Sequence, residues 1–272
     1  MTDDRERWAL VLGASSGMGE ASAVALANGG YNIFGVHLDF RAGIAHVDEV
    51  KARIAAAGRE AVFFNVNAAD DEKRAGVLDA IVARFAEIRA AGRTPHLRVV
   101  VHSLAFGSLL PFLSDDPKTR ISRRQLEMTL DVMASSLVYW TQDLFALELL
   151  SETRIYALTS EGSTRVIPSY GAVSAAKSAL ESNCRQLAME LARAGTRSSV
   201  NAIRAGVTVT PALLRIPGHA TVIKRTRKRN PSGRMTTTLD VGAAIVKLSE
   251  NGLLWMTGNV ISVDGGEFIT AS

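Results

Sequence analysis

Short apolar runs alternate along this chain with longer segments of helical periodicity. The runs are rich in β-branched residues and predict strands at 8–12, 33–38, 61–66, 99–103, 154–160, 198–203 and 259–263. Helical patterns are predicted at 20–28, 45–57, 71–91, 125–150 and 170–193. Strands and helices that alternate at this pace form βαβ units. The pattern therefore predicts an α/β fold with a parallel, doubly wound sheet.

Composition narrows the class of protein. With 272 residues and 47% hydrophobic content, the chain is long enough for one large domain and short for two. A net charge of +4 is too mild to indicate a nucleic-acid partner. Cys184 is the only cysteine, and no run approaches the roughly 18 apolar residues of a membrane helix. The charged start at 1–7 leaves no room for a signal peptide, so we expect a cytoplasmic protein with no membrane segment.

A glycine-rich turn follows the first predicted strand and precedes the first predicted helix. Such a turn lets the backbone approach a phosphate, and the helix start offers free N–H groups and partial positive charge. The strand, turn and helix in this order predict a dinucleotide phosphate cradle. Its residues are Gly13, Ser15, Ser16, Gly17, Met18 and Gly19.

The end of the second predicted strand bears on the choice of dinucleotide. Asp39 follows Gly19 by twenty residues, a spacing that suits a hydrogen bond to a free ribose 2′-hydroxyl and so NAD. Arg41 or His37 could instead attract the 2′-phosphate of NADP. The sequence leaves NADH and NADPH both open.

Tyr170 and Lys177 form the chemical pair that stands out in the sequence. Seven steps at roughly 100° each make nearly two turns, so both side chains lie on one face of the predicted helix. The ammonium favours the phenolate electrostatically, and a phenol so placed can donate a proton or hydrogen bond to an oxygen that becomes negative as hydride arrives.

A segment at about 211–234 has no clear strand, and we expect it to be a substrate-binding lid. It contains the basic run 224–229, in which five of six residues are lysine or arginine. The alternative is a solvated, flexible loop.

Five motifs together resemble the short-chain dehydrogenase/reductase family: 13–19, Tyr170, Lys177, Asn201-Ala202-Ile203 and Val263-Asp264-Gly265-Gly266. The match covers nearly the whole chain. The resemblance implies a seven-stranded Rossmann sheet, a nicotinamide dinucleotide and a homotetramer.

Departures from the majority pattern resemble one branch, the enoyl-acyl-carrier-protein reductases. Most members have Tyr-x-x-x-Lys, but Val173 stands in that tyrosine's place and Tyr170 precedes Lys177 with six residues between. The stretches 101–106 and 160–170 are similar to those reductases. Met133 occupies the place of the family's helix asparagine, so the proton relay of the alcohol dehydrogenases is expected to be missing.

This branch implies NADH- or NADPH-dependent reduction of the 2,3 double bond of trans-2-enoyl thioesters in fatty acid synthesis. Tyr170 would stabilise the thioester oxygen and Lys177 would hold the nicotinamide ribose. The basic run suits docking of an acidic acyl carrier protein. No metal is implied. Further cofactor contacts are expected at Asn65, Val66, Ser103, Leu104, Ala105, Gly206, Thr208 and Thr210.

Two other functions stay open. Ser160 falls where ordinary family members have a catalytic serine, so with Tyr170 it could support reduction of a carbonyl by a ketoreductase or alcohol dehydrogenase. A non-catalytic dinucleotide-binding regulator is the other alternative, although the presence of both Tyr170 and Lys177 argues against it.

Overall fold

Seven parallel strands form one sheet in the order β3-β2-β1-β4-β5-β6-β7. The structure, a computed structural model, describes residues 5–216 and 218–270. The order reverses direction between β1 and β4, as in a doubly wound sheet. The strands are β1 Glu6–Leu12, β2 Asn32–His37, β3 Ala61–Asn65, β4 Pro95–His102, β5 Arg154–Thr159, β6 Ser199–Ala205 and β7 Val260–Val263.

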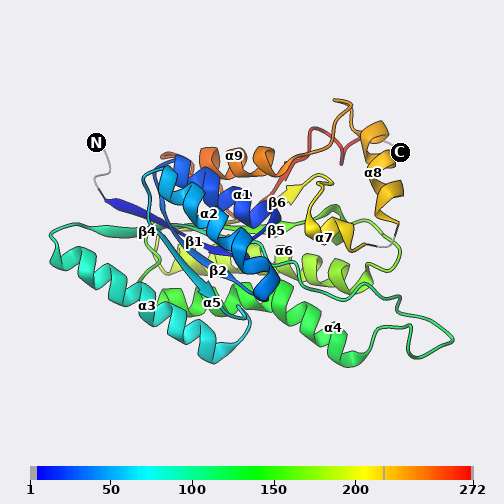
Figure 1. Cartoon of the computed structure of the whole chain (residues 1–272), viewed down its shortest axis with the longest axis horizontal. Coiled ribbons are helices and arrows are strands. Elements are labelled where there is room, and N and C mark those ends of the chain that lie inside the picture. The colour runs from blue at the N-terminus through cyan, green and yellow to red at the C-terminus, as the bar shows by residue number, and fades with distance from the viewer. Residues whose placement is uncertain (1–4, 217, 271–272) are drawn as a thin grey trace.

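Helices cover both faces of the sheet (Figure 1). One face carries α1 Gly17–Asn28, α2 Ile44–Ala56 and α9 Thr238–Leu248. The other carries α3 Asp71–Ala90, α4 Arg123–Leu130, α5 Ser136–Ala146 and α6 Gly171–Arg193. Beyond the carboxyl ends of the strands lie α7 Pro211–Leu214 and α8 His219–Arg229 (Figure 1). Three short helical turns are also present: η1 Arg41–Gly43, η2 Asp131–Ser135 and η3 Glu161–Ser163.

Two hydrophobic cores lie on opposite faces because neighbouring strand residues point to opposite sides. In β1, Ala9 and Val11 join the core beneath α1 and α9, whereas Trp8, Leu10 and Leu12 join the larger core beneath α3, α5 and α6. A strand buried on both faces reads as a continuous apolar run, which explains the pattern seen in the sequence. The fold prediction is confirmed.

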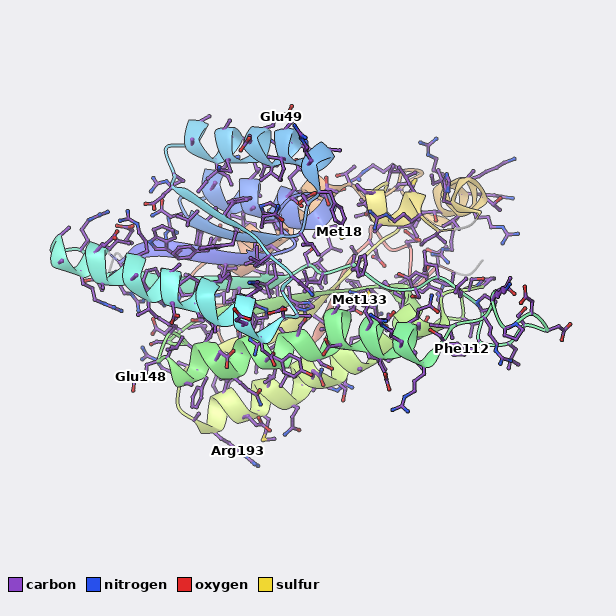
Figure 2. The ribbon with its side chains drawn as sticks, turned by 60° about the horizontal axis from the view of Figure 1, so that its bottom comes forward. Met18, Glu49, Phe112, Met133, Glu148 and Arg193 are labelled. Carbon is purple, nitrogen blue, oxygen red and sulfur yellow. The ribbon has the colours of Figure 1, made fainter. Side chains whose placement is uncertain are left out.

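The long helix predicted at 125–150 is three elements. Between α4 and α5, η2 Asp131–Ser135 is a turn of π-helix, and buried Met133 lies within it (Figure 2). Such a turn leaves carbonyls without their usual i+4 partners. Asn183 Nδ2 donates to the Ala134 carbonyl oxygen at 3.2 Å, and Ser136 Oγ donates to that of Val132 at 2.7 Å. Side chains therefore stabilise the irregular turn.

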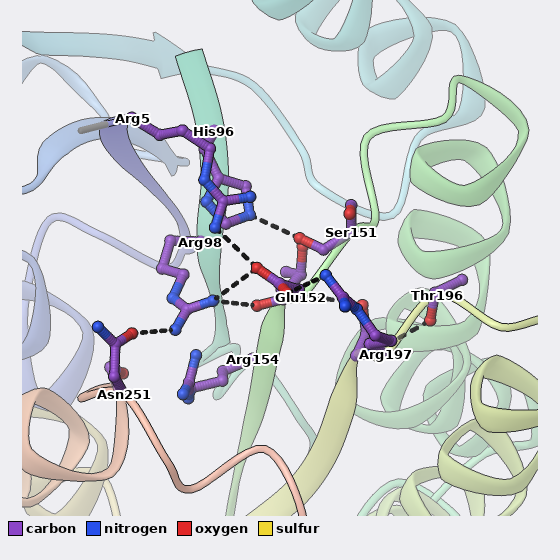
Figure 3. Close-up of polar contacts among 12 residues, drawn as sticks. Arg5, His96, Arg98, Ser151, Glu152, Arg154, Thr196, Arg197 and Asn251 are labelled. Atoms are coloured by element: carbon purple, nitrogen blue, oxygen red, sulfur yellow. Dashed lines mark hydrogen bonds and ion pairs between the residues drawn. The ribbon is translucent and has the colours of Figure 1, made fainter. Parts of the chain in front are cut away.

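Charged side chains form a network of polar contacts near the amino ends of the strands (Figure 3). Glu152 Oε2 lies 2.7 Å from Arg5 Nη2, and its other oxygen contacts Arg197. Arg98 donates to the Glu152 carbonyl oxygen at 2.8 Å. Glu152 and Arg197 both have left-handed backbone, with φ of 54° and 56°. Their ion pair fixes two neighbouring loops.

Two absences apply to residues 5–216 and 218–270. No described helix is long and apolar enough to cross a membrane. Within the same ranges, no group of three or more His, Cys, Asp or Glu side chains could hold a metal ion.

Candidate active site

The glycine-rich turn after β1 packs against the segment after β4. A Cβ atom at Gly19 would lie 1.9 Å from the Gly13 carbonyl oxygen, so only glycine fits there. Gly13 has a φ of 89°, and a Cβ atom at this residue would lie 2.5 Å from the Ser103 carbonyl oxygen. The predicted turn and the Ser103–Ala105 segment are thus in contact.

The turn leaves the start of α1 open. Ser16 is the N-cap residue, but its side chain makes no capping hydrogen bond, so the first N–H groups of α1 are available to a ligand. Ser15 is buried beside them, and Met18 stands in the first turn of α1 (Figure 2). Free N–H groups at a helix start, beside a closely packed glycine turn, fit a dinucleotide pyrophosphate.

Asp39 follows β2 and is held in place on two sides. His37 Nδ1 lies 2.9 Å from Asp39 Oδ2. The Asp39 backbone exchanges two hydrogen bonds with the Asn65 side chain, each of 2.9 Å. Arg41 is exposed in η1. The arrangement presents a fixed carboxylate acceptor, and His37 is engaged by that carboxylate.

Tyr170 is the N-cap residue of α6, so the helix begins one residue later than we predicted. The residue before it, Ser169, has left-handed backbone with a φ of 58°. The phenol ring packs over Gly162, where a Cβ atom would lie 2.7 Å from the ring. Burial raises the pKa of Tyr170. The nearby Ser160 hydroxyl lowers this pKa, and the negative charge of Glu161 raises it further. The phenol therefore stays protonated at neutral pH and acts as a donor.

Lys177 lies two turns into α6 and is buried. Its Nζ donates to the Leu158 carbonyl oxygen at 2.6 Å and, more weakly, to that of Leu104 at 3.5 Å. Burial lowers the pKa of Lys177 to about 8, while Cys184 and Glu181 act in the opposite direction. Lys177 thus links the ends of β4 and β5 to the helix that carries Tyr170.

Ser160 lies at the end of β5 beside Tyr170. Its Oγ is buried and makes no hydrogen bond of ordinary geometry with another described residue. The hydroxyl is nevertheless close enough to the phenol to affect its pKa. The predicted catalytic residues Ser160, Tyr170 and Lys177 therefore gather at the carboxyl ends of β4 and β5.

The remaining predicted contacts occupy the same end of the sheet. Thr210 packs against Gly17, where a Cβ atom would lie 3.5 Å from the threonine Cβ. Thr208 is buried and donates to the Gly206 carbonyl oxygen at 2.9 Å. Val66 follows β3 and is half-buried, with its N–H donating to the His37 carbonyl oxygen at 2.8 Å.

Sequence reasoning missed several residues that shape this region. The loop between β4 and α4 brings Phe112 against the start of α6, and a Cβ atom at Gly171 would lie 2.7 Å from its ring (Figure 2). Glu161 and Glu267 meet the last residue of α8, Arg229. The local sequence patterns gave no signal for either contact.

Comparison with known proteins identifies the family. The model of a family described as "Enoyl-(Acyl carrier protein) reductase" matches residues 13–267. The chain belongs to this family. The match includes the glycine-rich turn, Tyr170, Lys177 and the segment through Glu267.

Named enoyl reductases are among the similar proteins. The enoyl-[acyl-carrier-protein] reductase [NADH] FabI of Aquifex aeolicus is 35% identical over 173 residues, which are 64% of this chain and 63% of that protein. The FabI of Nostoc is 31% identical over 206 residues, 75% of this chain and 74% of that protein. The matches to the FabI proteins of Aquifex and Buchnera thus span 63% and 64% of those relatives' lengths.

Solved structures agree with the enoyl reductase fold. The crystal structure of the NADH-dependent enoyl-[acyl-carrier-protein] reductase from Aquifex aeolicus VF5 superposes with a TM-score of 0.82 at 25% identity, covering 99% of each chain. A 3-oxoacyl-[acyl-carrier protein] reductase from Brucella melitensis in complex with NAD gives 0.78 at 22% identity, covering 98% of this chain and 99% of that one. The second likeness bears on the fold alone.

Proposed function

We propose that this protein reduces the 2,3 double bond of trans-2-enoyl thioesters with a nicotinamide cofactor, as a step of fatty acid synthesis. One observation carries the proposal. In a chain of the enoyl reductase family, Tyr170 stands at the N-cap of α6, seven residues before buried Lys177, and its phenol is protonated at neutral pH. That arrangement suits a donor to a thioester oxygen.

A bound reduced nicotinamide would supply hydride to the β-carbon of the substrate, and negative charge would collect on the thioester carbonyl oxygen as an enolate forms. A proton from solvent, added at the α-carbon, would complete the reduction. Tyr170 donates a hydrogen bond to that oxygen, and because burial raises the pKa of its phenol, the donor is present throughout the neutral range. One such preorganised donor lowers the barrier by about 3–4 kcal/mol.

Lys177 holds the cofactor in place and keeps the local potential positive. Its ammonium is fixed by the Leu158 carbonyl oxygen at 2.6 Å, which leaves further N–H donors for the nicotinamide ribose hydroxyls. Met133 is apolar and buried where a proton-relay residue would need a polar side chain. This combination favours a role in charge stabilisation and cofactor orientation over alcohol deprotonation.

NADH is the cofactor that the site favours. The Asp39 carboxylate, fixed by His37 at 2.9 Å, accepts a hydrogen bond from a ribose 2′-hydroxyl and repels a 2′-phosphate. The Aquifex and Nostoc relatives carry NADH in their names. NADPH would require Arg41, exposed in η1, to outweigh that repulsion.

The test is spectrophotometric. Purified protein is mixed with crotonyl and longer trans-2-enoyl thioesters, with NADH and NADPH in parallel, and oxidation of the cofactor is followed by absorbance. We expect oxidation of NADH, and loss of about 10²–10³ in kcat in Tyr170→Phe because the phenol donor is removed. Unchanged turnover in Tyr170→Phe, or cofactor binding without turnover, would contradict the proposal.

Reduction of a carbonyl is the second candidate, favoured by one observation. The buried Ser160 hydroxyl has no ordinary hydrogen-bond partner among the described residues and lies beside Tyr170, so it is free to polarise a carbonyl. Ser160→Ala should then abolish turnover of 3-oxoacyl thioesters. For the enoyl reaction we expect Ser160→Ala to cost less than about tenfold in kcat, because Tyr170 alone contacts the oxygen.

The partner that presents the substrate is proposed to be an acyl carrier protein, docked on the lid at 211–234. Four cations of the basic run are exposed on α8: Lys224, Arg225, Arg227 and Lys228. Clustered positive charge steers an acidic partner toward the carboxyl ends of the strands, where Tyr170 lies. A coenzyme A thioester needs no such surface, so comparing the two substrates distinguishes an effect on docking from an effect on the chemical step.

We also propose that the protein is a cytoplasmic homotetramer. Exposed apolar side chains that a partner copy would cover lie on α5 and α6, at Phe145 and Met189, and before β7, where Trp255 is 96% exposed. The single Cys184 is a free, buried thiol, which agrees with a reducing compartment. Light scattering after size exclusion tests the assembly, and a monomeric mass would contradict it.

A further inference from the structure

The last residue of α8 behaves unlike the rest of its basic run. Lys224, Arg225, Arg227 and Lys228 are exposed, but the Arg229 side chain turns inward and keeps only 17% of its surface. Arg229 Nη2 lies 2.9 Å from Glu161 Oε2 and 2.5 Å from Glu267 Oε1. One cation therefore bridges two carboxylates from segments far apart in the sequence.

Each of these carboxylates belongs to a segment that forms the site. Glu161 follows Ser160 and opens η3, whose Gly162 lies under the ring of Tyr170. The second carboxylate, Glu267, is 2% exposed and accepts a hydrogen bond from the Val207 N–H at 3.1 Å. Val207 precedes Thr208, one of the expected cofactor contacts. Arg229 thus ties α8 to the loop beneath the phenol and to the loop after β6.

Neighbouring contacts also hold the end of α8 against the 264–268 segment. Asn230 is buried, and its Nδ2 donates to the Asp264 carbonyl oxygen at 2.8 Å. Arg165 Nη1 lies 3.5 Å from Glu161 Oε2 and its Nη2 donates to the Phe268 carbonyl oxygen at 2.5 Å. The 264–268 segment therefore receives both α8 and the η3 loop. Two contacts from successive residues, Arg229 and Asn230, fix the orientation of the helix end.

Charge gives Arg229 a second effect. Glu161 acts on Tyr170, where its negative charge raises the pKa of the phenol after the larger effect of burial. Burial and, to a smaller extent, the charge of Glu161 raise the pKa of Glu267, and Arg229 counteracts this. Leaving two carboxylates together without their shared cation is costly, because one of them is buried. The Arg229 charge therefore offsets the field that Glu161 exerts on the phenol.

We propose that Arg229 is a positioning residue that seats α8 on the Glu161 and Glu267 loops and shields the phenol of Tyr170 from the charge of Glu161. The catalytic half of this inference rests on the proposed function. The seating half concerns α8 alone, so it can be tested with no substrate. Because both carboxylate contacts run through one nitrogen, a lysine ammonium at position 229 can replace them in part.

The experiment compares Arg229→Gln, Arg229→Lys and the double variant Arg229→Gln/Glu161→Gln. Arg215→Gln is the matched control, because Arg215 is an exposed arginine of the same 211–234 segment. Unfolding midpoints establish that each variant folds. Cleavage by trypsin after residues 224–228 is followed by mass spectrometry, and kcat and KM are measured with NADH and crotonyl coenzyme A.

Arg229→Gln should raise the rate of cleavage at 224–228 about tenfold, because the helix end loses its seat and opens locally. It should lower kcat about tenfold with a smaller change in KM, because the donor strength of Tyr170 falls. Arg229→Lys should restore most of both values. Adding Glu161→Gln to Arg229→Gln should restore kcat but leave the helix sensitive to trypsin, because the charge is removed and the seat is still absent.

Two results would overturn the proposal. Cleavage and kcat in Arg229→Gln that match those of Arg215→Gln would show that the contact does nothing. A loss of kcat that Glu161→Gln fails to relieve would remove the shielding role. A wild type that turns over no enoyl thioester would count against the proposed function alone, and faster cleavage of Arg229→Gln would still support the seating of α8.

Discussion

His37 Nδ1 lies 2.9 Å from Asp39 Oδ2, so the last residue of β2 orients the carboxylate that follows it. The side chain of His37 is buried, whereas that of Asp39 stays 25% exposed, so His37 orients the carboxylate without burying it. A fixed acceptor at this point is a feature that separates NADH from NADPH.

We therefore expect Asp39→Asn to weaken NADH binding about tenfold to a hundredfold, because a hydrogen bond to a charged acceptor contributes about 1.5–3 kcal/mol. NADPH binding should be unchanged or stronger, because the repulsion of the 2′-phosphate is removed. Fluorescence titration with both cofactors measures this. Asp48→Asn, an exposed acid on α2, is the control, and equal weakening of both cofactors in Asp39→Asn would remove the discriminating role.

The lowered pKa of Lys177 leads us to expect that cofactor binding depends on pH. Its pKa is lowered from 10.5 to about 8 by burial, so the ammonium that holds the ribose is lost as pH rises through this value. In the free enzyme the Kd for NADH should rise above about pH 8, approaching a tenfold change per pH unit. Lys177→Arg keeps its charge and should bind with a flat profile between pH 7 and 9.5. A flat wild-type profile would contradict the prediction.

The same group affects stability in the opposite direction. The folded pKa of Lys177 lies below its ordinary value, so the unfolded chain binds more protons between about pH 8 and 10.5. The contribution of Lys177 to the free energy of unfolding should therefore increase with pH across this window. Urea unfolding of the cofactor-free wild type and of Lys177→Met measures the difference. The free energy of unfolding of the wild type should increase relative to that of Lys177→Met as pH rises from about 8 to 10.5.

Two glycines should respond oppositely to alanine. At Gly19 a Cβ atom would lie 1.9 Å from the Gly13 carbonyl oxygen, so Gly19→Ala must displace the turn and should abolish cofactor binding. In the middle of α3, a Cβ atom at Gly76 meets nothing within 4 Å. Gly76→Ala should raise the free energy of unfolding by about 0.5–1 kcal/mol through helix propensity. Denaturant unfolding and NADH titration test both, and cofactor binding by Gly19→Ala would refute the cradle.

Carrier docking predicts a dependence on substrate. Reversing the charge of the exposed cations Lys224, Arg225, Arg227 and Lys228 should raise KM for a carrier-linked enoyl thioester about tenfold or more at low salt, because steering is electrostatic. The KM for the coenzyme A thioester should be unchanged. Steady-state kinetics at two salt concentrations measures the effect, and equal effects on the two substrates would exclude docking on α8.

Much of the fold could be predicted because buried parallel strands have a local signature. The runs at 33–38, 61–66 and 154–160 coincide with β2, β3 and β5 to within a residue or two, since both faces of each strand are covered. β4 begins at Pro95, four residues before the predicted start at 99. The prediction began late because His96 and Arg98 interrupt the apolar pattern, although both side chains are buried in the structure. Side-chain burial of that kind is decided by tertiary contacts.

Other elements depend on contacts that no local pattern encodes. The π turn at 131–135 is stabilised by a distant residue, Asn183 on α6, which donates to the Ala134 carbonyl oxygen. α9 was not predicted, although Thr237 and Asp240 form a capping box at its start. The segment at 211–234 was predicted only to have no clear strand, and the structure shows that it contains the helices α7 and α8.

Within the site, spacing predicted that Tyr170 and Lys177 lie on one face of a helix, whereas no local pattern predicted the inward turn of Arg229. Its carboxylate partners, Glu161 and Glu267, are distant in the sequence. Local charge patterning described Arg229 as one more member of a basic run. Only the packing of α8 against the 264–268 segment separates it from its neighbours.

The ion pairs of Glu152 lie at one end of the sheet, and the candidate active site lies at the other. Glu152, Arg5, Arg98 and Arg197 fasten the amino ends of the strands, at the opposite end of the sheet from Tyr170 and the lid. Substitutions on α7 and α8 do not touch those fastenings. If the 211–234 segment binds the acyl group, as proposed, directed evolution of acyl specificity can begin there while these ion pairs are left intact.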